Sequence, residues 1–289
     1  MIWDTILQPF AEYGFMRRAL LGCVAISVGA TPVGTFLMLR RMSLTGDAMA
    51  HAILPGAAIG FLVSGLSLIP MTLGGLVAGL LVALLSGFVT RMTSLREDAS
   101  LAAFYLISLA IGVLIVSMRG NNVDLMHVLF GTVLALDDAT LILLCSISSL
   151  SLVILALLFR PLVLECADPQ FLRSVSGLSA ITHFTFLLLV VLNLVGGFHA
   201  IGTLMAVGVM ILPATAARFW ATSIGGMIIT AVAIAMISSL IGLLLSFYFS
   251  VPSGPAIILV NGLIYGMSLS FGPIGGIFAQ STTKQHIQI

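Results

Sequence analysis

The chain has 289 residues, of which 60% are hydrophobic and only 7% are charged. Soluble globular domains carry about 25% charged residues, so 11 Lys and Arg and 10 Asp and Glu residues cannot cover the surface of a soluble fold of this length. This composition excludes a soluble enzyme, a disordered chain and a nucleic-acid-binding protein. The apolar stretches are long and unbroken, unlike the alternating pattern of a β-barrel. The sequence therefore predicts an all-α, polytopic integral membrane protein with one transmembrane domain over residues 1–289.

Nine apolar stretches approach the length of about 20 residues that a membrane-spanning helix needs. In chain order the predicted spans are about 19–39, 44–64, 69–90, 99–118, 139–159, 179–197, 199–217, 224–250 and 254–276. Eight spans remain an alternative, because only Gly196 and Gly197 separate the sixth stretch from the seventh, and Pro252, Pro255 and Pro273 interrupt the last.

Positive charges predict the orientation of these spans. Grouped by alternate loops, eight Lys and Arg residues fall on one side and three on the other. The larger group is Arg40, Arg41, Arg91, Arg96, Arg160, Arg173, Arg218 and Lys284, and the smaller group is Arg17, Arg18 and Arg119. Because cytoplasmic loops are enriched in Lys and Arg, we expect the larger group in the cytoplasm, the N-terminus outside and the C-terminus inside.

Two of the predicted loops are long. The cytoplasmic loop at about 160–178 is polar, and Phe171, Leu172 and Val175 have the spacing of a short helix lying on the membrane surface. The outer loop at about 119–138 is half apolar, with Asp124 and His127 among its polar residues.

The second span contains the clearest pair of ionisable residues. Asp47 and His51 are four residues apart, so on a helix they lie on one face, one turn from each other. Ionisable groups within a membrane are costly and usually functional, and a carboxylate and an imidazole at this spacing can bind one divalent cation together. The alternative is structural: Asp47 caps the start of the helix and His51 hydrogen-bonds to a neighbouring helix. Pro55 follows one turn later and favours a break in the helix beside the pair.

Other candidate ligands stand more alone. His199 follows the two glycines between the sixth and seventh stretches, near the outer surface, and a single histidine there is either a ligand or a hydrogen-bonded structural group. Asp124 and His127 form a second acidic and histidine pair in the outer loop, where they are either ligands or solvated loop residues. The three cysteines, Cys23, Cys145 and Cys166, are too far apart in sequence to suggest a thiolate site.

Motifs for catalysis are missing from the sequence. It has no HExxH metalloprotease motif, and it has neither a phosphate-binding GxxxxGK[ST] loop nor any lysine other than Lys284. We therefore predict that the chain is not an enzyme, and that any step driven by ATP depends on a separate subunit.

Several segments together resemble the permease subunit of zinc and manganese ABC importers, the ABC-3 family. The matching segments are FMRRALLG at 15–22, LRRMSLTGDAMAHAILPG at 39–56, VDLMHVLFGTVLALDD at 123–138, ADPQFLRSV at 167–175 and GTLMAVGVMILPATAARF at 202–219. They occur in the family's order over nearly the whole chain. The long motif RRMSLxGDAxxHAxLPG is specific and carries most of the resemblance.

The resemblance implies a homodimeric permease with the bundle of a type II ABC importer, located in the bacterial inner membrane. Two ATP-hydrolysing subunits would bind on the cytoplasmic side, and a metal-binding protein would deliver the ion from outside. The family's acidic and histidine positions in the second span fall on Asp47 and His51. The segment HAIGTLMAVGVMILPA, which begins at His199, is most similar to zinc-associated members. We therefore expect Zn²⁺ first, or else Mn²⁺, as the transported ion, and no bound cofactor.

The resemblance also assigns the cytoplasmic loop to coupling with the ATPase. The coupling residues expected on this basis are Glu165, Ala167, Asp168, Phe171, Arg173 and Gly177. Two alternative functions remain open. A secondary metal transporter would need more intramembrane carboxylates than Asp47 alone, and an ABC permease for another metal, such as chelated iron, would share the same motifs.

Overall fold

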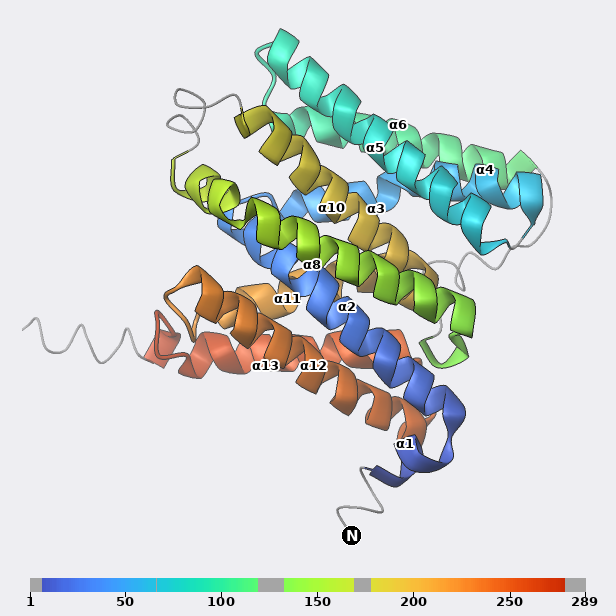
Figure 1. Cartoon of the computed structure of the whole chain (residues 1–289), viewed down its shortest axis with the longest axis vertical. Helices are drawn as coiled ribbons and strands as arrows, with labels where there is room; N and C mark the ends of the chain where they lie inside the picture. The colour runs from blue at the N-terminus through green and yellow to red at the C-terminus, as the bar shows by residue number, and fades with distance from the viewer. Residues whose placement is uncertain (1–6, 66, 119–132, 169–177, 279–289) are drawn as a thin grey trace, which may run out of the picture.

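The computed structural model describes residues 7–65, 67–118, 133–168 and 178–278 (Figure 1). Over these ranges the chain is helical and contains no β-strand. The α-helices are α1 (Gln8–Glu12), α2 (Gly14–Leu39), α3 (Ser43–Ala52), α4 (Leu54–Ser64), α5 (Leu68–Met92), α6 (Glu97–Met118), α8 (Asp138–Ala167), α10 (Leu178–Ile201), α11 (Thr203–Ala217), α12 (Ile224–Phe249) and α13 (Ser253–Phe271). A 3₁₀-helix, η2 (Val133–Ala135), precedes α8. The predicted all-α membrane fold is confirmed.

Eight helical stretches in the described residues are long and apolar enough to cross a membrane, when α3 and α4 are counted as one crossing over Ser43–Ser64. The shorter apolar helix α11, with 15 residues, corresponds to the predicted span 199–217. The predicted break at Gly196 and Gly197 is wrong, because α10 continues through both glycines to Ile201. The chain turns instead at Gly202, whose φ of 83° lies in the left-handed region that favours glycine.

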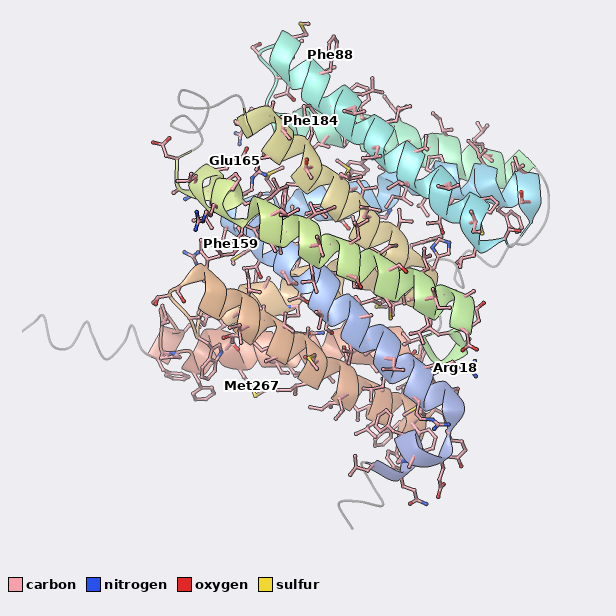
Figure 2. All side chains as sticks on the ribbon, viewed as in Figure 1. Arg18, Phe88, Phe159, Glu165, Phe184 and Met267 are labelled. Carbon is pink, nitrogen blue, oxygen red and sulfur yellow. The ribbon has the colours of Figure 1, made fainter. Side chains whose placement is uncertain are left out.

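Two ion pairs show which helix ends lie on the same side of the molecule. Arg40, at the C-terminal end of α2, pairs with Glu165 near the C-terminal end of α8. Arg18, near the N-terminal end of α2, pairs with Asp138 at the start of α8. Figure 2 shows Glu165 and Arg18 at opposite ends of the bundle. We call the end with Arg40 the inner end and the end with Arg18 the outer end, following the charge rule.

The cytoplasmic loop is shorter than the sequence predicted. Helix α8 continues past Arg160 and through Pro161 to Ala167, so residues 160–167 are helical rather than part of a loop. Pro161 lacks an N–H donor but does not end the helix here. Helix α8 therefore ends at Ala167, and Asp168 is its C-cap residue.

Helices α2 and α10 form the centre of the bundle. In an apolar 18-residue stretch of each helix, 72% of the stretch is buried inside the molecule for α2 and for α10, but only 22% for α5 and for α6. Small residues allow neighbouring backbones to approach closely, both at the centre and at the edge of the bundle. Gly34 of α2 lies against the Met210 carbonyl of α11, and Gly56 of α4 lies against Gly74 of α5. In Figure 1, α5 and α6 lie together at one edge of the bundle and α12 and α13 at the opposite edge.

Polar side chains join neighbouring helices inside the bundle. The Ser148 hydroxyl of α8 donates a hydrogen bond to the Ala25 carbonyl of α2 (2.7 Å). The Asn193 amide of α10 donates to the Ser151 hydroxyl of α8 (2.8 Å). Such hydrogen bonds between helices are favourable where water is absent, so α8 is fixed to both central helices.

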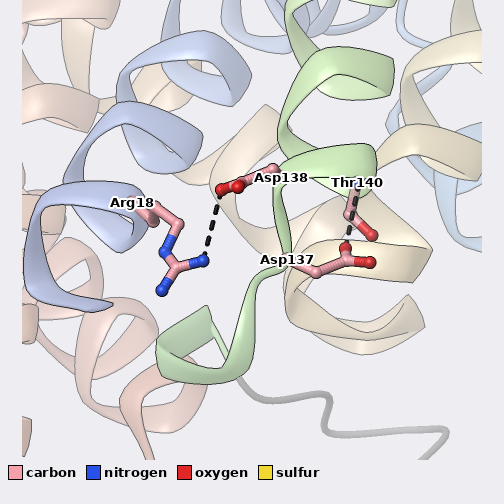
Figure 3. Close-up of polar contacts among 4 residues, drawn as sticks. All are labelled: Arg18, Asp137, Asp138 and Thr140. Carbon is pink, nitrogen blue, oxygen red and sulfur yellow. Dashed lines mark hydrogen bonds and ion pairs between the residues drawn. The ribbon is translucent and has the colours of Figure 1, made fainter. Parts of the chain in front are cut away.

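The outer end of α8 begins with a capped turn (Figure 3). Asp137 precedes the helix, and its carboxylate accepts a hydrogen bond from the backbone N–H of Thr140 (3.0 Å). Hydrogen bonds from Thr140 lower the pKa of the Asp137 carboxyl group from its ordinary value, because they stabilise the charged form. The cap supplies an acceptor to one of the backbone donors that the first turn of a helix leaves without a partner.

Candidate metal site

The candidate metal site lies on α3, a short helix that ends at a break. Pro55 lies in the first turn of α4 and has no backbone N–H, so a continuous helix through this point would lack a hydrogen bond. The chain therefore divides at Ile53 into α3 and α4, which confirms the predicted break beside the pair. The Ser108 hydroxyl of α6 donates a hydrogen bond to the Ala52 carbonyl at this point (3.0 Å), which satisfies an acceptor at the break.

Asp47 and His51 lie on one face of α3, as their spacing predicted. The distance between Asp47 Oδ1 and His51 Nε2 is 3.9 Å. The Asp47 side chain is 55% exposed and the His51 side chain is 23% exposed. A carboxylate oxygen and an imidazole nitrogen therefore lie close to each other, and the carboxylate remains accessible to an ion approaching from outside this chain.

The structural alternative for this pair does not agree with the geometry. Asp47 is inside α3 rather than at its start, and Met42 occupies the N-cap position without a side-chain hydrogen bond. The His51 Nδ1 atom is buried and has no hydrogen-bond partner among the described residues. Asp47 is thus not a helix cap, and His51 does not make the hydrogen bond to a neighbouring helix that would explain it as a structural residue.

Tyr105 of α6 packs beside the His51 ring. The two rings are stacked, with centroids 6.2 Å apart and an angle of 28° between their planes. Because Ser108 lies one turn further along α6 and bonds to Ala52, α6 contacts α3 at two neighbouring points. The orientation of His51 therefore depends on the packing of α6 against α3.

His199 lies near the outer end of α10, apart from the pair on α3. Its Nδ1 atom is 2.9 Å from the Val195 carbonyl oxygen, one turn earlier in the helix, and its Nε2 atom is buried without a partner in the described residues. Within those same residues, no three His, Cys, Asp or Glu side chains are close enough together to hold one metal ion. His199 therefore does not complete a site with Asp47 and His51 inside one chain.

Apart from Glu165, the remaining predicted site residues divide into two groups. Asp124 and His127, and the coupling residues Phe171, Arg173 and Gly177, lie outside the described residues. Ala167 and Asp168 are exposed at the inner end of α8, where a partner can contact them.

Glu165 differs from the other predicted coupling residues because it is buried. Its side chain is 6% exposed, and the Oε1 atom lies 3.2 Å from Arg40 Nη2. A side chain in this position cannot contact the surface of another subunit. The expectation that Glu165 contacts the ATPase directly is therefore not compatible with this conformation.

Arg40, the partner of Glu165, and His183, which contacts Arg40, were not predicted as site residues. Arg40 Nη2 also lies 2.8 Å from His183 Nδ1 of α10, and the Arg40 guanidinium lies over the Phe186 ring at 4.9 Å. In the sequence, Arg40 contributed only to the charge rule, as a positive residue at a helix end. No local pattern links Arg40 to Glu165 or His183, which are more than 120 positions away. The one signal was that all three are ionisable residues at the inner ends of predicted spans.

Comparisons with known proteins agree with the resemblance. The chain is 30% identical over 267 residues to the manganese import system permease protein ScaB of Streptococcus parasanguinis, covering 92% of this chain and 94% of that protein. It is 30% identical over 274 residues to a probable iron transport system membrane protein of Haemophilus influenzae, covering 94% and 99%. In the solved structure of PsaBC from Streptococcus pneumoniae in complex with Fab, one chain matches with a TM-score of 0.85 and 26% identity, covering 97% of this chain and 100% of that one.

The family follows from the extent of these matches. Residues 12–272 match the profile of the ABC 3 transport family, which is most of the sequence and includes every described spanning helix. Together with the eight apolar helices, these bacterial relatives place the chain in the bacterial cytoplasmic membrane as a multi-pass protein. This chain belongs to the ABC 3 transport family.

Proposed function

We propose that this chain is the membrane-spanning subunit of an ATP-driven importer for Mn²⁺ or Zn²⁺, and that Asp47 and His51 bind the ion in transit. The observation that carries this proposal is the pair itself. In a member of this family, a carboxylate and an imidazole lie 3.9 Å apart beside a helix break. In the described residues Asp47 does not cap a helix, and His51 Nδ1 makes no hydrogen bond, so neither side chain has the structural role that would explain an ionisable residue in a membrane span.

The pair supports a site shared between two copies of the chain. One copy offers two ligands, and no third His, Cys, Asp or Glu joins them in the described part of the molecule. Two copies related by a twofold axis would offer two carboxylates and two imidazoles, since a twofold interface brings the same residues together from both sides. Four nitrogen and oxygen ligands form a complete set for Zn²⁺ and a partial set for Mn²⁺, which would keep water molecules.

The energy for transport would come from other subunits. The sequence has no phosphate-binding loop, so we infer that two ATP-hydrolysing subunits bind at the inner end, where Ala167 and Asp168 are exposed. A metal-binding protein would deliver the ion at the outer end. ATP-driven movement of the inner end would then change the side from which Asp47 and His51 can be reached.

Two arguments bear on which metal is transported. The relative ScaB is named for manganese import, and carboxylate ligands suit Mn²⁺. Imidazole ligands suit Zn²⁺, and at a given site Zn²⁺ binds more tightly than Mn²⁺. A relative named for iron transport gives a third candidate. Uptake measurements with each ion and with competing ions separate these possibilities.

The test is ATP-dependent uptake by the assembled transporter in proteoliposomes. Wild type should accumulate ⁵⁴Mn or ⁶⁵Zn only when ATP, the ATPase subunits and the metal-binding protein are present. Asp47→Asn keeps the size of the side chain and removes its charge. We expect uptake to fall about a hundredfold, because losing an interaction of about 3 kcal/mol has that effect on affinity.

A matched control is available on α6. Asp98 is an exposed carboxylate at the inner end, 3.7 Å from Arg96, and Asp98→Asn should leave uptake unchanged. Uptake at the wild-type level by Asp47→Asn, at equal protein and ATPase levels, would show that Asp47 does not bind the ion.

A further inference from the structure

Three ionisable side chains meet at the inner end of the bundle, of which Glu165 is buried and Arg40 and His183 are partly buried. Arg40 from α2 contacts Glu165 of α8 at 3.2 Å and His183 of α10 at 2.8 Å. The Arg40 and Glu165 side chains are 10% and 6% exposed. We call Arg40, Glu165 and His183 the inner cluster. It holds the inner ends of three helices together where water is largely excluded.

The inner cluster lies on both sides of the segment proposed to meet the ATPase. Glu165 is in the last turn of α8, just before Asp168, and His183 is in the second turn of α10. A bound subunit that displaces the end of α8 or the start of α10 would displace Glu165 or His183. Arg40 contacts a side chain on each of these helices, so it responds to either movement.

Arg40 is also joined closely to the helix that carries the candidate metal ligands. Only Arg41 and Met42 lie between Arg40 and the start of α3. The Met42 N–H donates a hydrogen bond to the Leu37 carbonyl (2.9 Å) and the Arg41 N–H donates one to the Met38 carbonyl (3.1 Å). This is the Schellman motif that closes a helix, and Arg41 occupies its left-handed position with φ of 58°.

The turn between α2 and α3 is therefore fixed rather than loose. Met42 is buried, and its N–H also belongs to the hydrogen-bonded turn. Asp47 is four residues beyond Ser43, about 6 Å along the helix axis at 1.5 Å per residue. A shift or rotation of the inner end of α2 would be passed to Asp47 and His51 through a short connection without a flexible loop.

The contacts within the inner cluster are incomplete in a way that suits a change of partners. Arg40 Nη1 and Glu165 Oε2 are both buried and have no hydrogen-bond partner among the described residues. An Arg–carboxylate pair selected for stability alone would be bidentate, with both nitrogens and both oxygens engaged, or would be replaced by apolar residues. Within the described residues, this pair uses one atom from each side chain, and the second nitrogen and the second oxygen are left for another arrangement.

We propose that the inner cluster of Arg40, Glu165 and His183 couples movement of the ATPase-facing ends of α8 and α10 to the Asp47–His51 pair through the α2–α3 turn. This inference rests on the proposed function and assigns the three residues as positioning residues for transport, since none of them contacts the ion. It also gives Glu165 a place in coupling that agrees with its burial, inside the chain rather than at the surface of a partner.

The test is the double variant R40Q/E165Q in the assembled transporter. The substitution removes both charges together, so neither side chain leaves an unpaired buried charge. The readout is the number of ions accumulated per ATP hydrolysed. We expect this ratio to fall about tenfold or more, which is in the range of coupling between sites in proteins, while assembly with the ATPase subunits and Mn²⁺ binding by the purified permease stay at wild-type levels.

The matched control is R18Q/D138N at the outer end, which removes the exposed pair between the same two helices. It should keep the wild-type ratio of ions to ATP. A wild-type ratio in R40Q/E165Q would overturn the proposal, since an inner cluster with only a structural role predicts that result.

A second variant keeps the test decisive if the double variant does not fold. Arg40→Lys retains the charge but replaces the planar fork with a single ammonium group, so it should fold, bind Mn²⁺ and show a reduced ratio. An unchanged ratio in Arg40→Lys would then overturn the proposal. If wild type itself shows no ATP-dependent metal uptake, the proposed function fails. If wild type takes up metal and the variant has the same ratio of ions to ATP, only the proposal about the inner cluster fails.

Discussion

Helix α2 is fastened to α8 by an Arg–carboxylate pair at each end, and the two pairs have the same length. At the outer end, Arg18 Nη1 lies 3.2 Å from Asp138 Oδ1, with side chains that are 42% and 80% exposed (Figure 3). At the inner end, Arg40 Nη2 lies 3.2 Å from Glu165 Oε1, with side chains that are 10% and 6% exposed. The pairs differ in burial, not in geometry.

This difference shows that distance alone does not measure the importance of an ion pair. Water and salt screen the outer pair, so breaking it costs little. At the inner end, removing one partner leaves a charge in a medium that cannot solvate it. The inner end of α2 should therefore be sensitive to single substitutions and the outer end tolerant of them, although the same two helices are joined at both.

Removing one charge from the inner cluster should give the largest loss of stability. Glu165→Gln leaves the Arg40 guanidinium buried without its carboxylate, and we expect the free energy of unfolding to fall by about 3–5 kcal/mol. R40Q/E165Q should recover most of this loss, because no unpaired charge remains. Unfolding of the detergent-solubilised protein by a chemical denaturant measures both values. Equal losses in the single and double variants would contradict the account of the inner pair.

Adding one methyl group to α2 should also cost different amounts of stability at its two ends. A Cβ at Gly34, near the inner end, would meet the Met210 carbonyl of the α11 backbone, whereas a Cβ at Gly22, near the outer end, would meet the tip of the Leu136 side chain at 2.6 Å. The backbone cannot move aside easily but a leucine can. Gly34→Ala should therefore cost about 1–3 kcal/mol and Gly22→Ala less, as measured by the same unfolding method. A larger cost at Gly22 would show that the outer contact is the more rigid.

The cap at the outer end should contribute a smaller, pH-dependent amount. Asp137→Ala removes the acceptor for the Thr140 N–H and should cost about 1 kcal/mol. The folded-state pKa of Asp137 is lowered, so its contribution is present above the unfolded pKa of about 4 and is lost as pH falls through the folded value. The difference in stability between wild type and Asp137→Ala should therefore begin to shrink below about pH 4 and close as pH falls through the lowered folded-state pKa. A constant difference down to pH 2 would contradict this reading of the cap.

The exposed outer pair should give the smallest effect. Arg18→Gln or Asp138→Asn should change the free energy of unfolding by less than about 1 kcal/mol. The change should decrease further as salt is raised from 0.05 to 0.5 M, roughly the range over which screening becomes strong. A loss comparable with that of Glu165→Gln would remove the distinction between the two ends of α2.

Much of the fold could be predicted from the sequence because membrane spans depend on local composition. The break beside Asp47 and His51 was also predictable, since Pro55 cannot continue the hydrogen bonding of a helix. Gly196 and Gly197 were misinterpreted because a glycine can end a helix or allow close packing. In the structure, a Cβ at Gly197 would meet Ala206 at 2.6 Å, so this glycine allows packing, and Gly202 provides the turn.

The candidate site was only partly predictable for a related reason. The spacing of Asp47 and His51 defines their shared face, because four residues make about one helical turn. Burial of Glu165 depends on Arg40, which is 125 residues away in sequence, and stacking of Tyr105 on His51 depends on how α6 packs against α3. Neither contact has a local pattern, so both required the three-dimensional structure.

The central claim is that two copies of the chain bind one metal ion through Asp47 and His51. Titration of the purified permease with Mn²⁺, followed by electron paramagnetic resonance of the free ion, measures both the number of bound ions and their affinity. The account predicts one ion for every two chains in wild type and loss of that binding in Asp47→Asn, while Asp98→Asn keeps it. Binding of one ion per two chains in Asp47→Asn, with wild-type affinity, would contradict the account.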